Sequence, residues 1–318
     1  MNPYLFVVGC PRSGTTLLQR MLDAHPDLAV INETLWITRE AGRRNGVTRE
    51  GFVTSELVSR FFEYPRFRRL DIPREEVERL LDSDAPVPYP GFVSGIFDLY
   101  GRSRGKRLVG DKSPGYVREM ARLHRLWPEA KFVHLIRDGR DIWLSVAGWK
   151  KADRSVGQFA TWSQDPVATT ALWWERSIRL GREAGTSLGA ALYREVRYED
   201  LVEDPTHVCR SLCTFLGLPY DNAMLRFHEG RTKRVPGLTS KRAWLPPVAG
   251  LRDWRAQMPA EDLERFEATA GELLDELGYP RAVPRLPAAA SEHAAGIRSA
   301  FTEDARARGR ALPGRWPA

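Results

Sequence analysis

The sequence predicts an α/β fold with three layers, in which helices flank a central parallel sheet. Two short apolar runs, at residues 4–9 and 28–31, lie on either side of a helical pattern formed by Leu17, Leu18, Met21 and Leu22. Further apolar runs alternate with helical patterns later in the chain. A strand, a helix and another strand in this order require a crossover connection, which is typical of a parallel sheet.

The later elements follow from the same periodicities and from residues that begin or end helices. Asp204 before Pro205 is a typical helix start. Gly217 and Gly278 each follow an apolar helical pattern, and glycine commonly stands directly after the end of a helix. Strands are expected at residues 108–110, 131–136 and 191–196, and helices at 117–127, 140–149, 166–183, 205–216 and 263–277.

The chain divides into one domain and a tail. Residues 1–283 are expected to form a single domain. Within it, residues 35–107 are rich in Arg and Glu and lack a clear strand pattern, so we interpret them as a mostly helical insertion that serves as a lid or acceptor wall. Residues 284–318 contain mainly Ala, Arg, Pro and Gly with little apolar periodicity, which predicts a flexible tail.

Composition restricts the function classes. No apolar run approaches 18 residues and no signal peptide is recognisable, so a cytoplasmic protein without a membrane span is expected. The cysteines Cys10, Cys209 and Cys213 form no CxxC pair, which argues against a disulfide scaffold or a metal site. The net charge of +7 suits anionic ligands, but no dense basic tract indicates nucleic acid. The sequence does not indicate the oligomeric state.

The strongest local signal is Gly9-Cys10-Pro11-Arg12-Ser13-Gly14-Thr15-Thr16, between a predicted strand and a helix. The glycine spacing and the final Thr follow the Walker A pattern, but Thr15 occupies the position of its Lys. Converging backbone N–H groups and the helix dipole favour an anion at such a turn. We therefore predict a P-loop-type fold, in which one phosphate-like group is bound without a metal ion by Arg12, Ser13, Gly14, Thr15 and Thr16. A turn without a ligand is the alternative.

A second signal follows the strand at residues 131–136. Arg137 stands at its carboxyl end, and Ser145 lies one to two turns into the next helix. Ligands of open parallel sheets bind at this edge, so Arg137 and Ser145 are predicted to bind a second phosphate. Two such sites imply a nucleotide that is phosphorylated at two places. The alternative is a surface cluster of ion pairs among Arg137, Asp138 and Arg140.

Together, these two blocks resemble the sulfotransferase superfamily that uses 3′-phosphoadenosine 5′-phosphosulfate (PAPS). Residues 11–16 resemble its 5′-phosphosulfate loop, and residues 136–145 resemble its 3′-phosphate block. Residues 22–34 are similar to tyrosylprotein sulfotransferases and to bacterial members. The resemblance covers roughly residues 4–34, 108–150 and 190–280. It implies a PAPS-dependent enzyme that transfers a sulfuryl group to a hydroxyl or amine, with no metal.

The resemblance also implies roles for individual residues. Glu33 matches the carboxylate that takes the acceptor's proton, Lys112 a lysine that steadies transferred charge, and Tyr198 a tyrosine that contacts the cofactor. Arg12 would stabilise the bridging and phosphate oxygens. Asn32 and Trp149 depart from the tyrosylprotein group and weaken the case for a peptidyl-tyrosine acceptor.

Alternatives remain open for these residues. Glu33 could be a surface carboxylate paired with an Arg, and Lys112 could pair with Asp111. The rival bases are His25, His124 and His134.

Rival functions and the acceptor also remain open at this point. The rival functions are a P-loop nucleotide kinase, which would need Mg²⁺, and a non-catalytic nucleotide-binding protein. The acceptor could be a small molecule, carbohydrate, lipid or peptide. Six aromatic residues could line an acceptor pocket or belong to the core, namely Trp36, Tyr89, Phe92, Trp149, Trp162 and Trp244.

Overall fold

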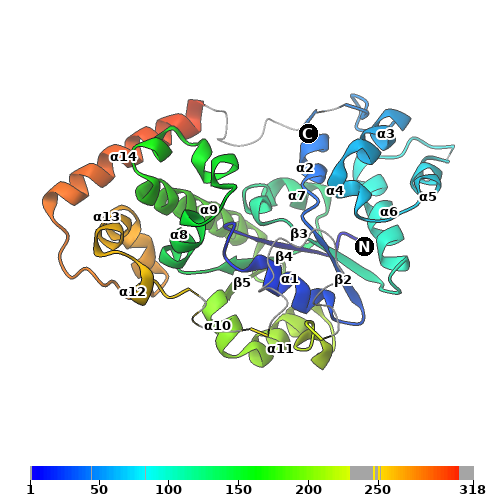
Figure 1. Ribbon diagram of the computed structural model, residues 1–318. Helices are drawn as coiled ribbons and strands as arrows, with labels where there is room; N and C mark the ends of the chain where they lie inside the picture. The colour runs from blue at the N-terminus through cyan, green and yellow to red at the C-terminus, as the bar shows by residue number, and fades with distance from the viewer. Residues whose placement is uncertain are drawn as a thin grey trace.

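The computed structural model describes residues 2–43, 45–82, 84–229, 246–247, 250 and 252–307. A five-stranded parallel sheet lies at its centre, with the strand order β2-β3-β1-β4-β5 (Figure 1). The predicted α/β architecture is thus confirmed. The strands are β1 (Leu5–Gly9), β2 (Leu28–Asn32), β3 (Leu108–Lys112), β4 (Lys131–Ile136) and β5 (Tyr193–Arg197).

Helices fill the connections between the strands. None of those in the described ranges is long and apolar enough to cross a membrane. The α-helices are α1 (Thr15–Asp23), α2 (Trp36–Arg43), α3 (Ser55–Glu63), α4 (Pro65–Arg68), α5 (Arg74–Glu78), α6 (Tyr89–Arg102), α7 (Met120–Leu126), α8 (Gly139–Ala147), α9 (Pro166–Leu188), α10 (Tyr198–Glu203), α11 (Pro205–Leu216), α12 (Trp254–Gln257), α13 (Ala260–Glu276) and α14 (Ala288–Ala307). Short 3₁₀ helices are η1 (Arg79–Leu81), η2 (Pro114–Arg118), η3 (Ala152–Arg154), η4 (Val156–Gln158), η5 (Ala160–Ser163) and η6 (Asn222–Met224).

Both faces of the sheet are covered, and β1 shows how the sequence achieves this. Successive side chains of a strand point to opposite faces. Leu5 and Val7 pack with the apolar side chains of α1 and α11, whereas Phe6 and Val8 pack with those of the insertion, η2 and α7. All four are fully buried, and each contributes about 1.5–3 kcal/mol by leaving water. This is why the strand reads as a continuous apolar run.

The insertion is helical, as predicted, and it has its own aromatic core. The rings of Trp36, Phe61 and Phe67 pack with centroids 4.7–5.4 Å apart. Tyr89 and Phe92 are also buried in this cluster, so three of the six aromatic candidates for an acceptor pocket belong to the core. Trp149 and Trp162 are half-buried, and Trp244 lies outside the described residues.

The prediction of a flexible tail from residue 284 is wrong for most of that segment, because α14 occupies Ala288–Ala307. Four buried residues at intervals of three and four form a narrow stripe on α14: Ala294, Ile297, Phe301 and Ala305. Phe301 stacks on Phe159 at 4.2 Å between ring centroids. Alanine fills half of this stripe, which is why the apolar pattern is weak in the sequence. Residues 308–318 lie outside the described ranges.

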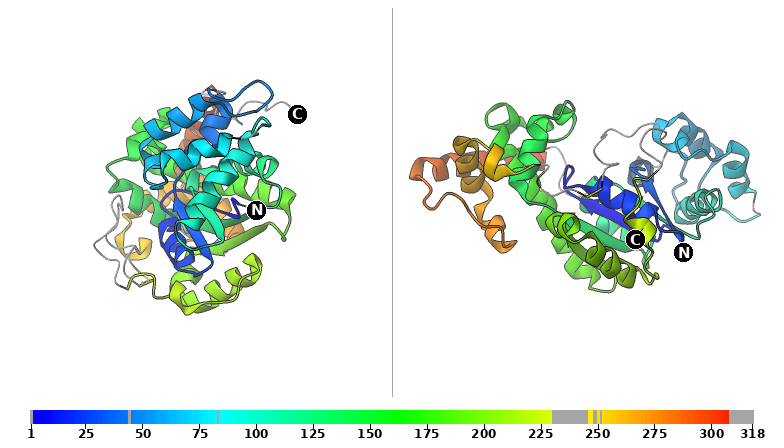
Figure 2. Two further views of the ribbon diagram at one scale, coloured as in Figure 1. Left: turned by 90° about the vertical axis from the view of Figure 1, so that its right-hand side faces the viewer. Right: turned by 60° about the horizontal axis from the view of Figure 1, so that its bottom comes forward.

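The insertion and the C-terminal helices α13 and α14 lie at opposite ends of the sheet, with the sheet between them (Figure 2). On the C-terminal side, α8, α9, α13 and α14 form a separate apolar cluster that also includes Cys10 and Ile136. The carboxyl ends of β1 and β4 therefore lie beside this helical group, which supports the loops that follow both strands.

Some element boundaries differ from the predicted ones, and β3 matters most. It extends past Gly110 to Lys112, because neighbours on both sides pair with Asp111 and Lys112. The apolar pattern of the sequence does not predict this extension, since the last two residues of the buried strand, Asp111 and Lys112, are charged. The helix expected at 117–127 is interrupted at Glu119, which has φ −115°, and α13 is kinked at Ala270.

Candidate functional site

The turn between β1 and α1 leaves a helix N-terminus without a side-chain cap. Gly14 occupies the cap position with φ 94°, and no side chain of the described residues bonds there. In contrast, Asp138, Asp165 and Asp204 cap α8, α9 and α11. A Cβ atom on Gly14 would lie 2.4 Å from the ring of Tyr198, so glycine is required for this close packing. The first turn of α1 is thus arranged to receive an anion.

Two buried polar atoms beside this turn lack a hydrogen-bond partner among the described residues. They are the Ser13 hydroxyl oxygen and the Nε of Arg137. Ser13 is fully buried and Arg137 is 6% exposed. Leaving such a group unpaired costs about 1–3 kcal/mol, so native proteins usually satisfy it. Both groups can donate a hydrogen bond to an anion, as the two predicted sites require.

Arg12 joins the two predicted anion sites directly. Its Nε donates to the Ser145 hydroxyl at 2.9 Å, and its guanidinium lies 5.3 Å from the ring centre of Trp149. Burial lowers the pKa of Arg12, and the positive charges of Arg252 and Arg137 lower it further. This concentration of positive charge favours a multiply charged anion.

Arg252 was missed by sequence reasoning, because it belongs to no recognisable motif. Its Nη1 donates to the carbonyl oxygen of Leu144 in α8 at 2.9 Å. The only sequence signal that could have found it is its place two residues before Trp254, in a block resembling the superfamily.

Arg137 is held in place by two contacts. Its Nη2 lies 3.2 Å from the Asp141 carboxylate, and its guanidinium lies 4.1 Å from the ring centre of Tyr198. Asp141 also accepts a hydrogen bond from the backbone of Trp254 at 3.0 Å. Burial raises the pKa of Asp141 to about 6, although Arg137 opposes the shift. Arg137 is therefore held beside the loop of residues 9–16 through Tyr198, and its binding of a second anion stays a prediction.

Arg140 has a different role from Arg137. Its guanidinium is fully buried and pairs with Asp138 and Glu267, each at 2.7 Å. It also lies 3.5 Å from the ring centre of Trp254. The alternative of a surface ion-pair cluster is therefore wrong: Arg140 links α8 to α13 in the interior, and Arg137 lies at the sheet edge.

A third group forms where β2 and β3 end side by side. Asn32 is opposite Lys112 in the sheet, and the Glu33 backbone N–H donates to the Lys112 carbonyl at 2.7 Å. The Lys112 ammonium lies 3.0 Å from Glu33 Oε1 and 3.3 Å from the Thr16 hydroxyl. Arg66 of α4 donates to Glu33 Oε2 at 2.6 Å. Glu33 and Lys112 thus meet beside the phosphate loop.

The charges of this group decide its protonation. Burial by itself would raise the pKa of Glu33, but Lys112 and Arg66 outweigh burial and hold that pKa below its ordinary value. Burial lowers the pKa of Lys112, and the negative charge of Glu33 opposes this shift. Glu33 is consequently an ionised carboxylate at neutral pH, in the form that can accept a proton.

The predicted site residues form three groups of contacts, which the loop of residues 12–16 joins. Thr16 contacts Lys112, Lys112 contacts Glu33, Arg12 contacts Ser145, and Tyr198 contacts both Gly14 and Arg137. Ser13 and Thr15 are buried in the same loop.

Two of the three rival histidines form hydrogen bonds away from this set of residues, and the third, His124, lies in α7. His25 contacts the Pro219 carbonyl and His134 contacts the Tyr193 hydroxyl. The pairing of Lys112 with Asp111 gives way to the contact with Glu33, whereas the pairing of Glu33 with an arginine does occur, through Arg66.

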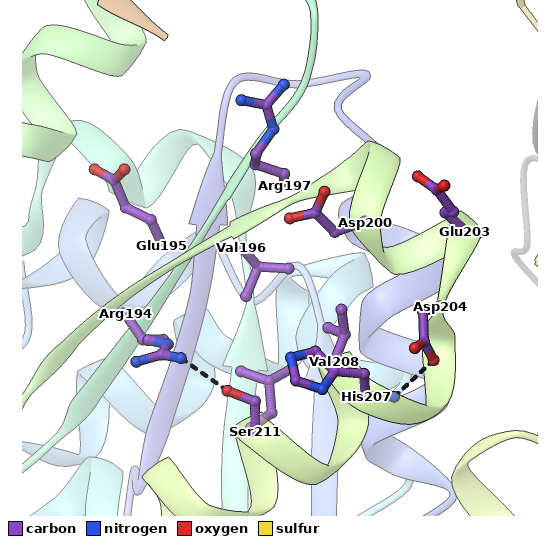
Figure 3. A pocket seen from close by; sticks show the side chains of 11 residues that line it. Arg194, Glu195, Val196, Arg197, Asp200, Glu203, Asp204, His207, Val208 and Ser211 are labelled. Carbon is purple, nitrogen blue, oxygen red and sulfur yellow. Dashed lines mark hydrogen bonds between the residues drawn. The ribbon is translucent and has the colours of Figure 1, made fainter. Parts of the chain in front are cut away.

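A cavity of about 470 Å³ lies elsewhere, between β5, α10 and α11 (Figure 3). Arg194, Asp204 and His207 are among its lining residues, and none of the predicted site residues lines it. Among the described residues, no group of three or more His, Cys, Asp or Glu side chains is arranged to hold a metal ion.

Comparison with known families matches residues 3–222 to the sulfotransferase family. The chain is 28% identical to protein-tyrosine sulfotransferase 1 of Danio rerio over 292 residues, which cover 89% of this chain and 74% of the relative. It is 27% identical to protein-tyrosine sulfotransferase A of Caenorhabditis elegans over 289 residues, covering 89% and 69%.

Two solved structures have a similar fold. The sulfotransferase domain of the olefin synthase from Synechococcus PCC 7002 aligns with a TM-score of 0.54 at 24% identity, covering 88% of this chain and 95% of that domain. The sulfotransferase domain of the curacin biosynthetic pathway aligns with a TM-score of 0.54 at 20% identity, covering 94% and 98%.

Proposed function

Because the chain belongs to the sulfotransferase family and is therefore an enzyme of sulfuryl transfer, we propose that its donor is PAPS. The observation that carries the proposal is the contact between Arg12 and Ser145, since it joins the two predicted anion sites beside the carboxyl ends of β1 and β4. A nucleotide with phosphate groups at two positions matches this pair of sites. The positive charges of Arg252 and Arg137 lie close enough to Arg12 to lower its pKa.

The residues of the site fit this donor. The uncapped N-terminus of α1 and the Ser13 hydroxyl suit a 5′-phosphosulfate, and the unpartnered Arg137 Nε suits a 3′-phosphate. Arg12, Ser13, Gly14, Thr15 and Thr16 would hold the first group. Arg137 and Ser145 would hold the second group, with Tyr198 packed between the two sites.

The chain's own side chains then supply the remaining chemistry. When bound, PAPS supplies an activated sulfuryl group, whose bond to the 5′-phosphate oxygen breaks as a bond to the acceptor forms. Glu33 takes the proton of the acceptor hydroxyl or amine on its carboxylate, a role worth about 10²–10⁴-fold in rate. Lys112 carries a positive charge between Glu33 and Thr16, where it would offset negative charge on the sulfuryl oxygens. Arg12 would offset the charge left on the phosphate.

The acceptor class is the part of the function that needs a direct assay. The two relatives named above are protein-tyrosine sulfotransferases, so a tyrosine-containing peptide belongs in the panel. Asn32 and Trp149, which depart from that group, support testing simpler phenols, sugars and hydroxylated lipids beside it.

The proposal is tested by transfer from ³⁵S-labelled PAPS to this acceptor panel in the presence of EDTA. We expect labelled product from at least one acceptor class with the wild-type chain and almost none with Glu33→Gln. Transfer that requires a divalent ion, or that is unchanged in Glu33→Gln, would contradict the proposed mechanism.

A further inference from the structure

Arg66 belongs to the insertion, far in sequence from every motif that resembles the superfamily. It is the second residue of α4, whose Phe67 is buried in the aromatic core of the insertion. Its Nη1 donates to Glu33 twice, to Oε2 at 2.6 Å and to the backbone carbonyl at 3.3 Å. An element outside the nucleotide-binding part of the fold therefore holds the carboxylate at the centre of the site.

The two oxygens of Glu33 have different partners on different sides. Oε1 contacts Lys112, which is 1% exposed and also contacts Thr16 of the phosphate loop. Oε2 contacts Arg66. The side chains of Arg66 and Glu33 are 33% and 32% exposed. Lys112 thus marks the buried, donor side of the carboxylate, and Arg66 marks the side open to solvent, from which an acceptor can approach.

The backbone of Glu33 also needs external support. Its φ of 59° is a left-handed conformation that residues other than glycine seldom adopt, and such strain persists only where the surroundings enforce it. The contact of Arg66 with the Glu33 carbonyl is one such constraint, and the bond from the Glu33 N–H to Lys112 is another.

We propose that Arg66 is a positioning residue, which fixes the Glu33 carboxylate from the acceptor side of the site. This inference rests on the proposed function, because it takes Glu33 as the base. It means that the insertion completes the active site rather than only covering it. A misplacement of about 1 Å can cost a factor of about 10² in rate, so the loss of this contact should be visible in kcat.

Electrostatics gives a readout that a purely structural role would not change. The hydrogen bond and the positive charge of Arg66 both lower the pKa of Glu33, and Lys112 acts in the same direction against burial. Without Arg66, burial is opposed mainly by Lys112, so the pKa of Glu33 must rise. The pKa of the Glu33 carboxyl group therefore reports the contact directly, whatever the acceptor.

The experiment compares wild type, Arg66→Met, Arg66→Lys and a matched control, Arg68→Met. Arg68 lies on the same helix and is exposed, so its replacement alters charge but not the contact. The pKa of Glu33 is measured by NMR titration of ¹³C-carboxyl-labelled glutamates, with the Glu33 signal identified by its absence in Glu33→Gln. We expect a higher pKa in Arg66→Met, partial recovery in Arg66→Lys and no change in Arg68→Met.

Turnover provides the second readout, with whichever acceptor the labelled-donor panel identifies. Arg66→Met should lower kcat about 10- to 100-fold while KM for PAPS stays within about twofold, and Arg66→Lys should recover part of kcat. An unchanged Glu33 pKa or an unchanged kcat in Arg66→Met would overturn the proposal. Failure of wild type to bind adenosine 3′,5′-bisphosphate (PAP) would instead refute the proposed function, and the NMR titration would still report on Arg66 separately.

Discussion

Two residues with proposed chemical roles, Arg12 and Glu33, have backbone conformations that ordinary L-residues rarely adopt. Their φ values are 79° and 59°. Strain of this kind costs on the order of 1–3 kcal/mol and is commonly found at functional sites. At both positions the side chain meets a residue from a distant segment, Ser145 for Arg12 and Lys112 for Glu33. The strained turns therefore direct these side chains across the ends of the sheet strands.

Replacing Glu33 with Gln tests the base. The amide keeps the size of the side chain but cannot take a proton from the acceptor, so kcat should fall about 10²–10⁴-fold. The affinity for PAP should remain within a few-fold, since the contacts of Arg12, Ser145 and Arg137 are preserved. Calorimetry with PAP and the labelled-donor assay separate these effects. Full activity in Glu33→Gln would remove Glu33 from the mechanism.

At the scale of elements, local patterns predict the strands and the phosphate loop because their physics is local. The apolar run of β1 and the glycine spacing of the loop need no distant contact for their interpretation. The contribution of Arg66 could not be predicted in this way, since α4 meets Glu33, the residue after β2, only through the tertiary fold. The same holds for α14, because its narrow stripe of buried residues can be recognised as a packing face only once α9 and α13 are seen beside it.

The link between α8 and α13 offers a stability test at this scale. Replacing Arg140 with Met leaves Glu267 and Asp138 buried without their cation, which should cost about 3–5 kcal/mol in the free energy of unfolding. Arg179→Met is the matched control, because the Arg179 side chain is 45% exposed. Of its two partners, Glu276 is exposed and the buried Glu175 keeps its ion pair with Arg298, so the loss should be about 1 kcal/mol or less. Urea unfolding followed by tryptophan fluorescence measures both. Equal losses in the two variants would contradict the structural role given to Arg140.

For the whole molecule, the sheet brings together motifs that lie far apart in the chain. The order β2-β3-β1-β4 places Glu33, Lys112, the phosphate loop and Arg137 at the carboxyl ends of four adjacent strands. The sequence predicts each motif, and the rule for parallel sheets predicts their common edge. It does not predict the shape of the acceptor side, because the insertion packs through its own aromatic core.

The acid stability of the whole fold depends in part on His134. Burial lowers the pKa of this imidazole to about 4. The unfolded chain takes up its proton near pH 6.5, so the free energy of unfolding falls as the pH drops from about 6.5 to 4, by up to about 3 kcal/mol from this group. His134→Gln should flatten that decline, while the difference between variant and wild type stays constant above pH 7. Urea unfolding at pH 7.5, 6, 5 and 4 measures it, and parallel curves would refute the assignment.

In the proposed function, the carboxyl ends of neighbouring strands bind both phosphates of an adenine nucleotide without a divalent ion. Isothermal titration calorimetry of folded protein with PAP in the presence of EDTA is the decisive experiment. We predict saturable binding at one site. Affinity should fall at least about tenfold in Arg137→Ala, because that variant loses the charge-assisted hydrogen bonds proposed between Arg137, which packs on Tyr198, and the 3′-phosphate. The absence of binding by wild type, or equal affinity in Arg137→Ala, would contradict it.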